Sequence, residues 1–362
     1  MSKDSYEKLA EHLDAMPQGF PRTDSGIEIR ILKKIFSEEE AEVASQMKLT
    51  PETAEQVAER VGRDTREMAE LLERMASKGQ LLAMGPRDAR MYMALAFLVG
   101  IHEFQLERID KEYAELFEKY FEEALAEQLG REAPAQARVY PVEQAIPDKI
   151  TVFPFEKVTE MVGKAQAWGV TDCICRKEMK LTGKGCDATM NNCIAFSADP
   201  HGFDIDYRGV RKITKEECLD LLKKAEEEGL VHNSWNVQDS HVFICNCCAC
   251  CCLILRGVKM ARSPHVLAKA NYFAQIDPDT CVACGLCADE RCPMEAIDGR
   301  GDYYEVNLER CIGCGVCVVT CPSGALSLQQ KDEAQIDVPP DNIVAWTMEK
   351  AQKTGRTLEG LI

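Results

Sequence analysis

The sequence CVACGLCADERCP occupies residues 281–293, and a near-copy, CIGCGVCVVTCP, follows at residues 311–322. Each copy contains three cysteines separated by two residues and a fourth cysteine that precedes a proline. In Cys-x2-Cys-x2-Cys the backbone curls around one face of a cluster, so that three sulfurs reach three irons. Gly285, Gly313 and Gly315 allow the close backbone approach and positive φ angles that this curl requires. The two copies therefore predict two [4Fe-4S] clusters.

The fourth cysteine of each copy lies too far along the chain to reach the same cluster. In proteins with two such clusters it binds the other one. The first predicted ligand set is Cys281, Cys284, Cys287 and Cys321, and the second is Cys311, Cys314, Cys317 and Cys292. The first copy has one residue more before its fourth cysteine, and we expect this residue to bulge near 289–290. Zinc is the alternative metal, but structural zinc sites rarely use this triple spacing.

Residues 271–330 resemble the bacterial two-cluster ferredoxin family. Both cysteine motifs are complete, and the copies also match beyond cysteine, with CPMEAI at 292–297 against CPSGAL at 321–326. The resemblance implies a small domain that transfers single electrons at low potential through its clusters.

A second group of cysteines lies in the middle of the chain, where CNCCACCC at 245–252 contains six of them. Packing alone does not explain such a density, because valine or alanine fills the same space without a risk of oxidation. We expect one or two further iron–sulfur clusters here. The candidate ligands are Cys173, Cys175, Cys186, Cys193, Cys245, Cys247, Cys248, Cys250, Cys251 and Cys252.

The assignment of these ten thiols to individual sites stays open. Adjacent side chains point in different directions, so Cys247 and Cys248, or Cys250 and Cys251, are expected to serve different sites. A zinc site, or a redox-active dithiol such as Cys251 with Cys252, is the alternative. Cys218 lies within a helix predicted from Thr214 to Glu228, and we expect it to be a core residue.

Over most of its length the chain resembles a group of bacterial and archaeal 4Fe-4S binding proteins. These proteins combine a winged-helix-like N-terminus, a CxCR segment, an NCCxCC segment and a C-terminal 2[4Fe-4S] ferredoxin domain. The matching segments here are TAEQVAER at 53–60, GIHEFQ at 100–105, CICRKE at 173–178 and FICNCC at 243–248. The resemblance implies electron transfer, usually alongside another oxidoreductase, and points to no particular substrate.

The pattern of apolar residues predicts an α+β multidomain chain. The expected parts are an N-terminal arm (1–24), a winged-helix-like domain (25–100), a long helix with a proline-containing linker (101–150), a cysteine-rich α+β domain (151–270), the ferredoxin domain (271–330) and a C-terminal tail helix (331–362). The winged-helix expectation rests on helices at 53–61 and 65–77 followed by strands at 81–84 and 90–95. The long helix, 101–129, is expected to serve packing or oligomerisation.

The net charge of −17 argues against nucleic acid and anionic membranes as partners and favours a redox protein with a basic docking surface, such as a flavoprotein, a ferredoxin or an oxidoreductase subunit. The N-terminus lacks the apolar core of a signal peptide, and no apolar stretch reaches the ~20 residues of a membrane span. We therefore expect a cytoplasmic protein, most simply one of anaerobic metabolism. No nucleotide or flavin motif is found, so iron–sulfur clusters are the only cofactors predicted.

These observations favour an electron-transfer subunit or partner of an oxidoreductase, without catalytic residues of its own that can be named. Two alternatives stay open. One is a reductase with an open coordination site on a middle-domain cluster, and the other is a redox-sensing regulator that uses the winged helix.

Overall fold

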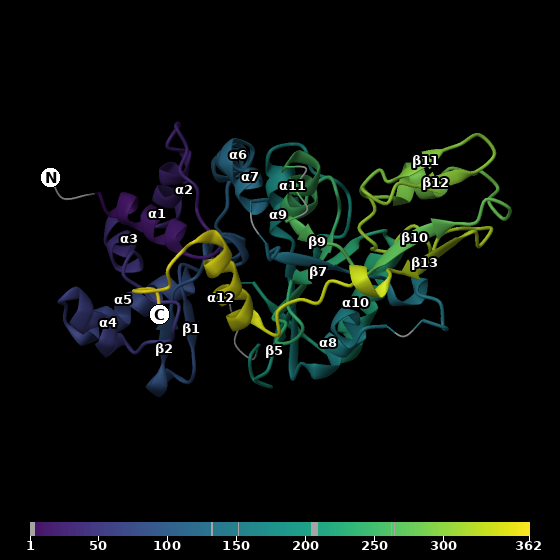
Figure 1. Cartoon of the computed structure of the whole chain (residues 1–362). Coiled ribbons are helices and arrows are strands. Elements are labelled where there is room, and N and C mark those ends of the chain that lie inside the picture. Colours follow the sequence, from purple (N-terminus) through teal and green to yellow (C-terminus); the bar gives the residue numbers. More distant parts are fainter. Residues whose placement is uncertain (1–3, 132, 151, 204–208, 262, 264) are drawn as a thin grey trace.

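The structure, a computed structural model, describes residues 4–131, 133–150, 152–203, 209–261, 263 and 265–362. The N-terminal helices lie at one end, a mixed sheet lies in the middle, and the two hairpins of the ferredoxin region lie at the other end (Figure 1). Among the described residues, no helix combines the length and the apolar character needed to cross a membrane.

The N-terminal end is built from short capped helices and one hairpin. Its elements are α1 (Ser5–Ala15), α2 (Ile27–Ile35), α3 (Glu38–Ala44), α4 (Ala54–Val61), α5 (Thr65–Ser77), β1 (Leu82–Met84) and β2 (Met91–Met93). Thr53 and Gln56 form a capping box at the start of α4. The predicted order of two helices followed by an antiparallel hairpin is present. The winged-helix assignment itself stays a prediction.

The N-terminal arm predicted for residues 1–24 is wrong for its described part, and residues 1–3 lie outside the described residues. Leu9 and Leu13 of α1 are buried in the same core as Ile31 and Leu72. The helix is amphipathic, so its apolar face is covered by the domain that follows rather than left free.

The long helix predicted over 101–129 is wrong in its first part. Asp110 accepts a hydrogen bond from the backbone N–H of Tyr113 at 2.7 Å, so α6 (Lys111–Tyr120) begins only there. It continues through a π-helical turn (Phe121–Leu125) into α7 (Ala126–Leu129). Its apolar face packs inside this chain, against α2 and α9 (Ile174–Leu181).

The linker predicted before residue 150 is also wrong, because β3 (Ala137–Tyr140) is a fully buried strand. It pairs antiparallel with β7 and parallel with β9. In the described part of the chain the sheet order is β6-β4-β5-β8-β7-β3-β9. The other strands are β4 (Ala167–Asp172), β5 (Asn191–Ser197), β6 (Arg211–Ile213), β7 (Val231–Trp235), β8 (Phe243–Cys247) and β9 (Leu267–Ala268).

Helices α8 (Val158–Lys164), α10 (Lys215–Glu227) and α11 (Leu253–Ala261) complete this middle region. Thr214 caps α10, as the sequence predicts. The sheet brings segments that are far apart in sequence side by side. In particular, β5 and β8 are antiparallel neighbours, so the cysteines that they carry meet across the strand pair.

The ferredoxin region contains two antiparallel pairs of strands. β10 (Tyr272–Ile276) pairs with β13 (Leu326–Gln330), and β11 (Ile297–Gly299) pairs with β12 (Tyr304–Val306). Arg138 of β3 is buried where this region meets the middle sheet. Its guanidinium binds Glu156 at 3.1 Å and also donates to the backbone carbonyl of Lys269 and to Asp337.

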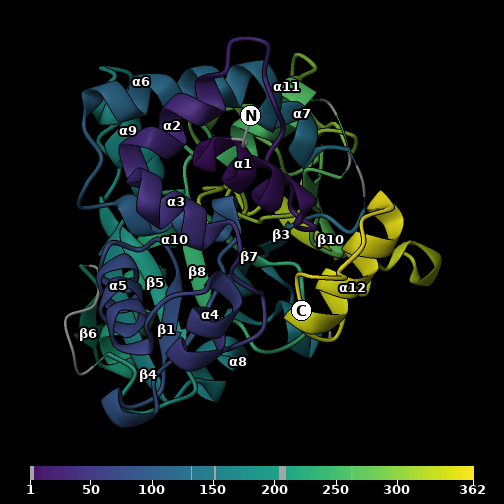
Figure 2. The ribbon, with the colours of Figure 1, turned by 90° about the vertical axis from the view of Figure 1, so that its left-hand side faces the viewer.

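The chain then returns from the ferredoxin region toward the N-terminal end. Helix α12 (Ile343–Thr354) places Trp346 against Trp235 of β7, with the ring centroids 5.1 Å apart. Leu361 reaches the N-terminal core. Figure 2, which looks at the N-terminal end of the molecule, shows α12 beside that end. The tail therefore connects the middle region with the N-terminal helices.

Candidate metal centres

The first ferredoxin set surrounds a hollow of about 330 Å³. Cys281, Cys284, Cys287 and Cys321 line it together with apolar side chains and Tyr304. Cys284 is exposed, as is Val282 beside it. This hollow therefore lies at the surface of the ferredoxin region.

The second set surrounds a similar hollow of about 320 Å³. Its lining includes Cys292, Cys311, Cys314 and Cys317, with Cys314 and Cys317 buried. The N–H of Val142, which follows β3, donates to the carbonyl of Cys314 at 2.9 Å. This hollow thus faces the middle region.

Each hollow unites three cysteines of one copy with the fourth cysteine of the other, as the spacing predicts. The extra residue of the first copy is taken up in a π-helical turn at Cys287–Arg291, where a bulge is expected. Gly313 has a φ of +74°, and a Cβ there would lie 2.2 Å from the carbonyl oxygen of Tyr272. Only glycine fits this part of the curl.

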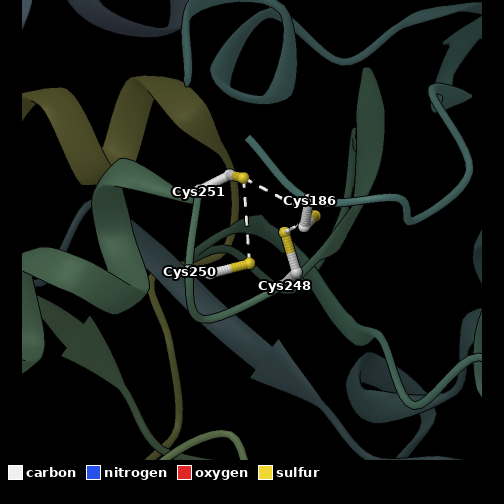
Figure 3. Close-up of side chains that lie close together, drawn as sticks. All are labelled: Cys186, Cys248, Cys250 and Cys251. Atoms are coloured by element: carbon white, nitrogen blue, oxygen red, sulfur yellow. Dashed lines mark hydrogen bonds between the residues drawn. The ribbon is translucent and has the colours of Figure 1, made fainter. Parts of the chain in front are cut away.

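Four thiols of the middle region form a compact group, which we call the four-thiol group: Cys186, Cys248, Cys250 and Cys251. Their sulfur atoms all lie within 4.8 Å of one another and face a common centre (Figure 3). Cys186 comes from the loop between α9 and β5, and the other three come from the turn between β8 and α11. Four thiols in this arrangement fit a four-cysteine cluster.

The remaining six candidate ligands form a second set, which we call the six-thiol row. Neighbouring thiols interact in the order Cys173, Cys175, Cys252, Cys247, Cys245 and Cys193. The sulfurs of Cys193 and Cys245 lie 3.7 Å apart across the paired strands β5 and β8. Cys252 lies just before α11, and the backbone N–H groups of Ile254 and Leu255 interact with its sulfur.

Two expectations about adjacent cysteines have different outcomes. Cys247 is the last residue of β8 and joins the six-thiol row, whereas Cys248 begins the turn and joins the four-thiol group. The expectation that Cys250 and Cys251 separate is wrong, because their sulfurs lie 3.8 Å apart. Alternation of side chains holds in a strand, but these two residues lie in a turn.

Arg176 of the CxCR segment lies between the two sets with its side chain fully buried. Burial opposes its charge, but the thiols of Cys173 and Cys248 outweigh this effect and raise the pKa of the guanidinium. From the sequence alone, this residue fits either a cluster partner or a surface salt bridge. Its burial excludes the surface position.

Other residues considered in the sequence lie outside these sets. Cys218 is buried in the core of α10, and burial raises the pKa of its thiol to about 12. His232 binds Asn246 and Glu226, and His241 lies 3.2 Å from the hydroxyl of Ser234. These histidines serve the packing of the middle sheet in the described structure.

Comparison with known proteins identifies the C-terminal part. Residues 274–328 match the 4Fe-4S dicluster domain family. An uncharacterised ferredoxin of Methanocaldococcus jannaschii is 39% identical over 54 residues, which are 14% of this chain and 32% of that protein. Hydrogenase-4 component A of Escherichia coli is 34% identical over 85 residues, 23% of this chain and 41% of its own length. No solved structure matches.

A third relative is subunit delta of the NADH-dependent phenylglyoxylate dehydrogenase of Aromatoleum evansii, 36% identical over 47 residues, 13% of this chain and 50% of the subunit. The chain thus spans half or less of each of these relatives. Residues 274–328 are a ferredoxin-type 4Fe-4S domain, and the cysteine hollows described above lie within it or at its edges.

Proposed function

We propose that this protein relays single low-potential electrons as a subunit or partner of an oxidoreductase. Cys281, Cys284, Cys287 and Cys321 would hold one [4Fe-4S] cluster, and Cys311, Cys314, Cys317 and Cys292 the other. The four-thiol group and four or more thiols of the six-thiol row would hold two further clusters. A bound cluster of this kind accepts and releases one electron at a time.

The observation that carries this proposal is a continuous core between the two cysteine-rich regions. Cys314 and Cys317 of the second ferredoxin set belong to the same buried cluster of residues as Cys247 and Cys252 of the six-thiol row. The ligand sets thus follow one another through packed protein that excludes water.

Both ends of this series reach the surface. Cys284 is exposed at the ferredoxin end, and Cys250 of the four-thiol group is exposed at the other end. A donor and an acceptor can therefore dock at separate places. The net charge of −17 favours basic docking surfaces on these partners. The printed names of two relatives, a hydrogenase component and a dehydrogenase subunit, support an oxidoreductase as the partner.

The test is the iron and sulfide content of anaerobically reconstituted full-length protein, combined with EPR of the reduced state. Four occupied sites predict about sixteen irons per chain, at four irons per cluster. Eight irons with two EPR signals would restrict the clusters to the ferredoxin region and contradict the longer relay. Zinc in place of iron would contradict the middle sites directly.

A reductase is the second candidate, and one buried network favours it. Nδ1 of His102 lies 3.0 Å from the hydroxyl of Tyr113, and its Nε2 lies 3.5 Å from Glu178 on α9, one turn after Cys175. Burial lowers the pKa of His102, but the carboxyl group of Glu178 outweighs this and raises it. Such groups can hold a proton near the six-thiol row. A change in a middle-domain EPR signal on addition of a small oxidised substrate would support this hypothesis, and no change over a broad panel would count against it.

The regulator hypothesis has weaker support. Arg66 and Arg90 on and after α5 pair with Glu70 and Glu73, so their charges are partly neutralised where phosphates would bind. We propose instead that the winged-helix-like region docks a protein. Retardation of promoter DNA at physiological salt would overturn this assignment.

A further inference from the structure

Arg176 is a buried cation whose oxygen acceptors are all neutral. One terminal nitrogen donates to the carbonyl of Thr189 at 2.8 Å and to Oδ1 of Asn192 at 2.7 Å. The other donates to the carbonyl of Asn246 at 2.7 Å. Its Nε has no hydrogen-bond partner among the described residues. A fully buried charge without a counter-charge is strongly unfavourable.

The counter-charge is found in the thiols on both sides of this side chain. The guanidinium interacts with Cys173 and Cys247 of the six-thiol row and with Cys248 of the four-thiol group. Arg256 offers a contrast within the same region. It also lies near Cys175, but both of its terminal nitrogens bind the carboxylate of Glu118, at 2.7 and 2.8 Å.

We propose that Arg176 is the shared counter-ion of two iron–sulfur sites, one in the four-thiol group and one in the six-thiol row, and that its charge raises the reduction potentials of both. This inference rests on the proposed function, because it requires both middle sites to be occupied. Arg176 is a positioning residue and takes no part in ligation.

The sign follows from electrostatics. Reduction adds one negative charge to a site, and a nearby positive charge stabilises the reduced form more than the oxidised form. Loss of this charge therefore lowers both potentials. In a buried setting the effect is little screened by salt.

The sharpest variant is Asn192→Asp. It places a carboxylate where an amide oxygen now accepts from Arg176 at 2.7 Å, and Nδ2 of Asn192 has no hydrogen-bond partner to lose. We expect full iron content, lower midpoint potentials for both middle-domain signals, and unchanged ferredoxin signals, in redox titrations followed by EPR. Arg176→Gln should shift the same two signals downward, and Arg176→Lys should restore most of the shift because it keeps the charge.

The control is Gln352→Glu on the exposed face of α12, which changes the net charge by the same amount. We expect it to shift no signal. Iron-loaded Asn192→Asp protein with unchanged potentials would overturn the inference, as would equal behaviour of Arg176→Lys and Arg176→Gln. Wild-type protein with only eight irons would overturn the proposed function as well, and this result is recognised before any variant is made.

Discussion

The ferredoxin region and the middle region collect their thiols in different ways. In the ferredoxin region, eight cysteines lie within residues 281–321, and the chain folds back once to complete each set. In the middle region, ten cysteines between 173 and 252 come from strand ends, a loop and a turn. The first arrangement is set by local spacing, and the second is set by the pairing of β5 with β8. Spacing therefore predicts ligand sets only where the ligands are local.

The largest expected effect tests this contrast at two adjacent residues. Cys248→Ala should remove the cluster of the four-thiol group, and Cys247→Ala should disturb only the six-thiol row, because β8 ends between them. Each loss amounts to about four irons per chain. EPR should show a different signal missing in each variant. The same missing signal in both would mean that the ten thiols act as one site.

The joint between the two regions carries the next effect. Arg138→Met leaves the carboxylate of Glu156 buried without its partner, and both side chains are fully buried. We expect a loss of about 3–5 kcal/mol in the free energy of unfolding. Anaerobic urea denaturation followed by circular dichroism measures it.

The matched control is Arg211→Ala, which breaks an exposed pair with Glu217. The expected cost there is below about 1 kcal/mol. Equal losses in the two variants would show that the joint does not depend on the buried charge pair.

A glycine pair tests how tightly the ferredoxin region depends on its local curl. Gly313 and Gly324 both have positive φ, but only Gly313 faces a backbone oxygen at close range, whereas a Cβ on Gly324 meets open space. Gly324→Ala should cost about 1–2 kcal/mol from backbone strain alone. Gly313→Ala should cost more and lower the iron content of the second set. Similar iron contents would show that the curl tolerates a side chain.

The smallest effect concerns the cysteine that belongs to neither region's sites. Cys218→Ala removes a buried sulfur from the core of α10, which should cost about 1 kcal/mol. Iron content and all EPR signals should stay unchanged. A missing signal would place Cys218 among the ligands and contradict its position in the described core.

Much of the local structure is predictable from the sequence. The caps at Thr53 and Thr214, the helix from Thr65 to Ser77 and the last helix after Asn342 follow from short signals that act within one turn. The two ferredoxin sets are predicted for the same reason, since their spacing is local. The extra residue before Cys292 is also taken up where the spacing places it.

The errors arise where distant contacts decide the structure. The buried strand β3 lies among prolines that predict a linker, because its four residues give too short an apolar pattern to identify. The helix expected from residue 101 fails because Asp110 provides a cap inside it. The division of the ten middle thiols depends on the sheet order, which one sequence does not specify. Arg176 is visible in the CxCR segment, but its burial between two thiol sets is not.

The strands that lead into and out of the ferredoxin region are paired with each other, with Tyr272 opposite Gln330. Just outside this pair, Asn271 donates to the carbonyl of Asp337, and Arg138 binds the same residue from the middle sheet. A swinging carrier domain needs a pivot at its attachment, and here both attachment points are held by buried hydrogen bonds. The ferredoxin region is thus a fixed terminal. Its partner must come to it, so turnover should depend on partner concentration and dissociation rather than on reorientation of a tethered arm.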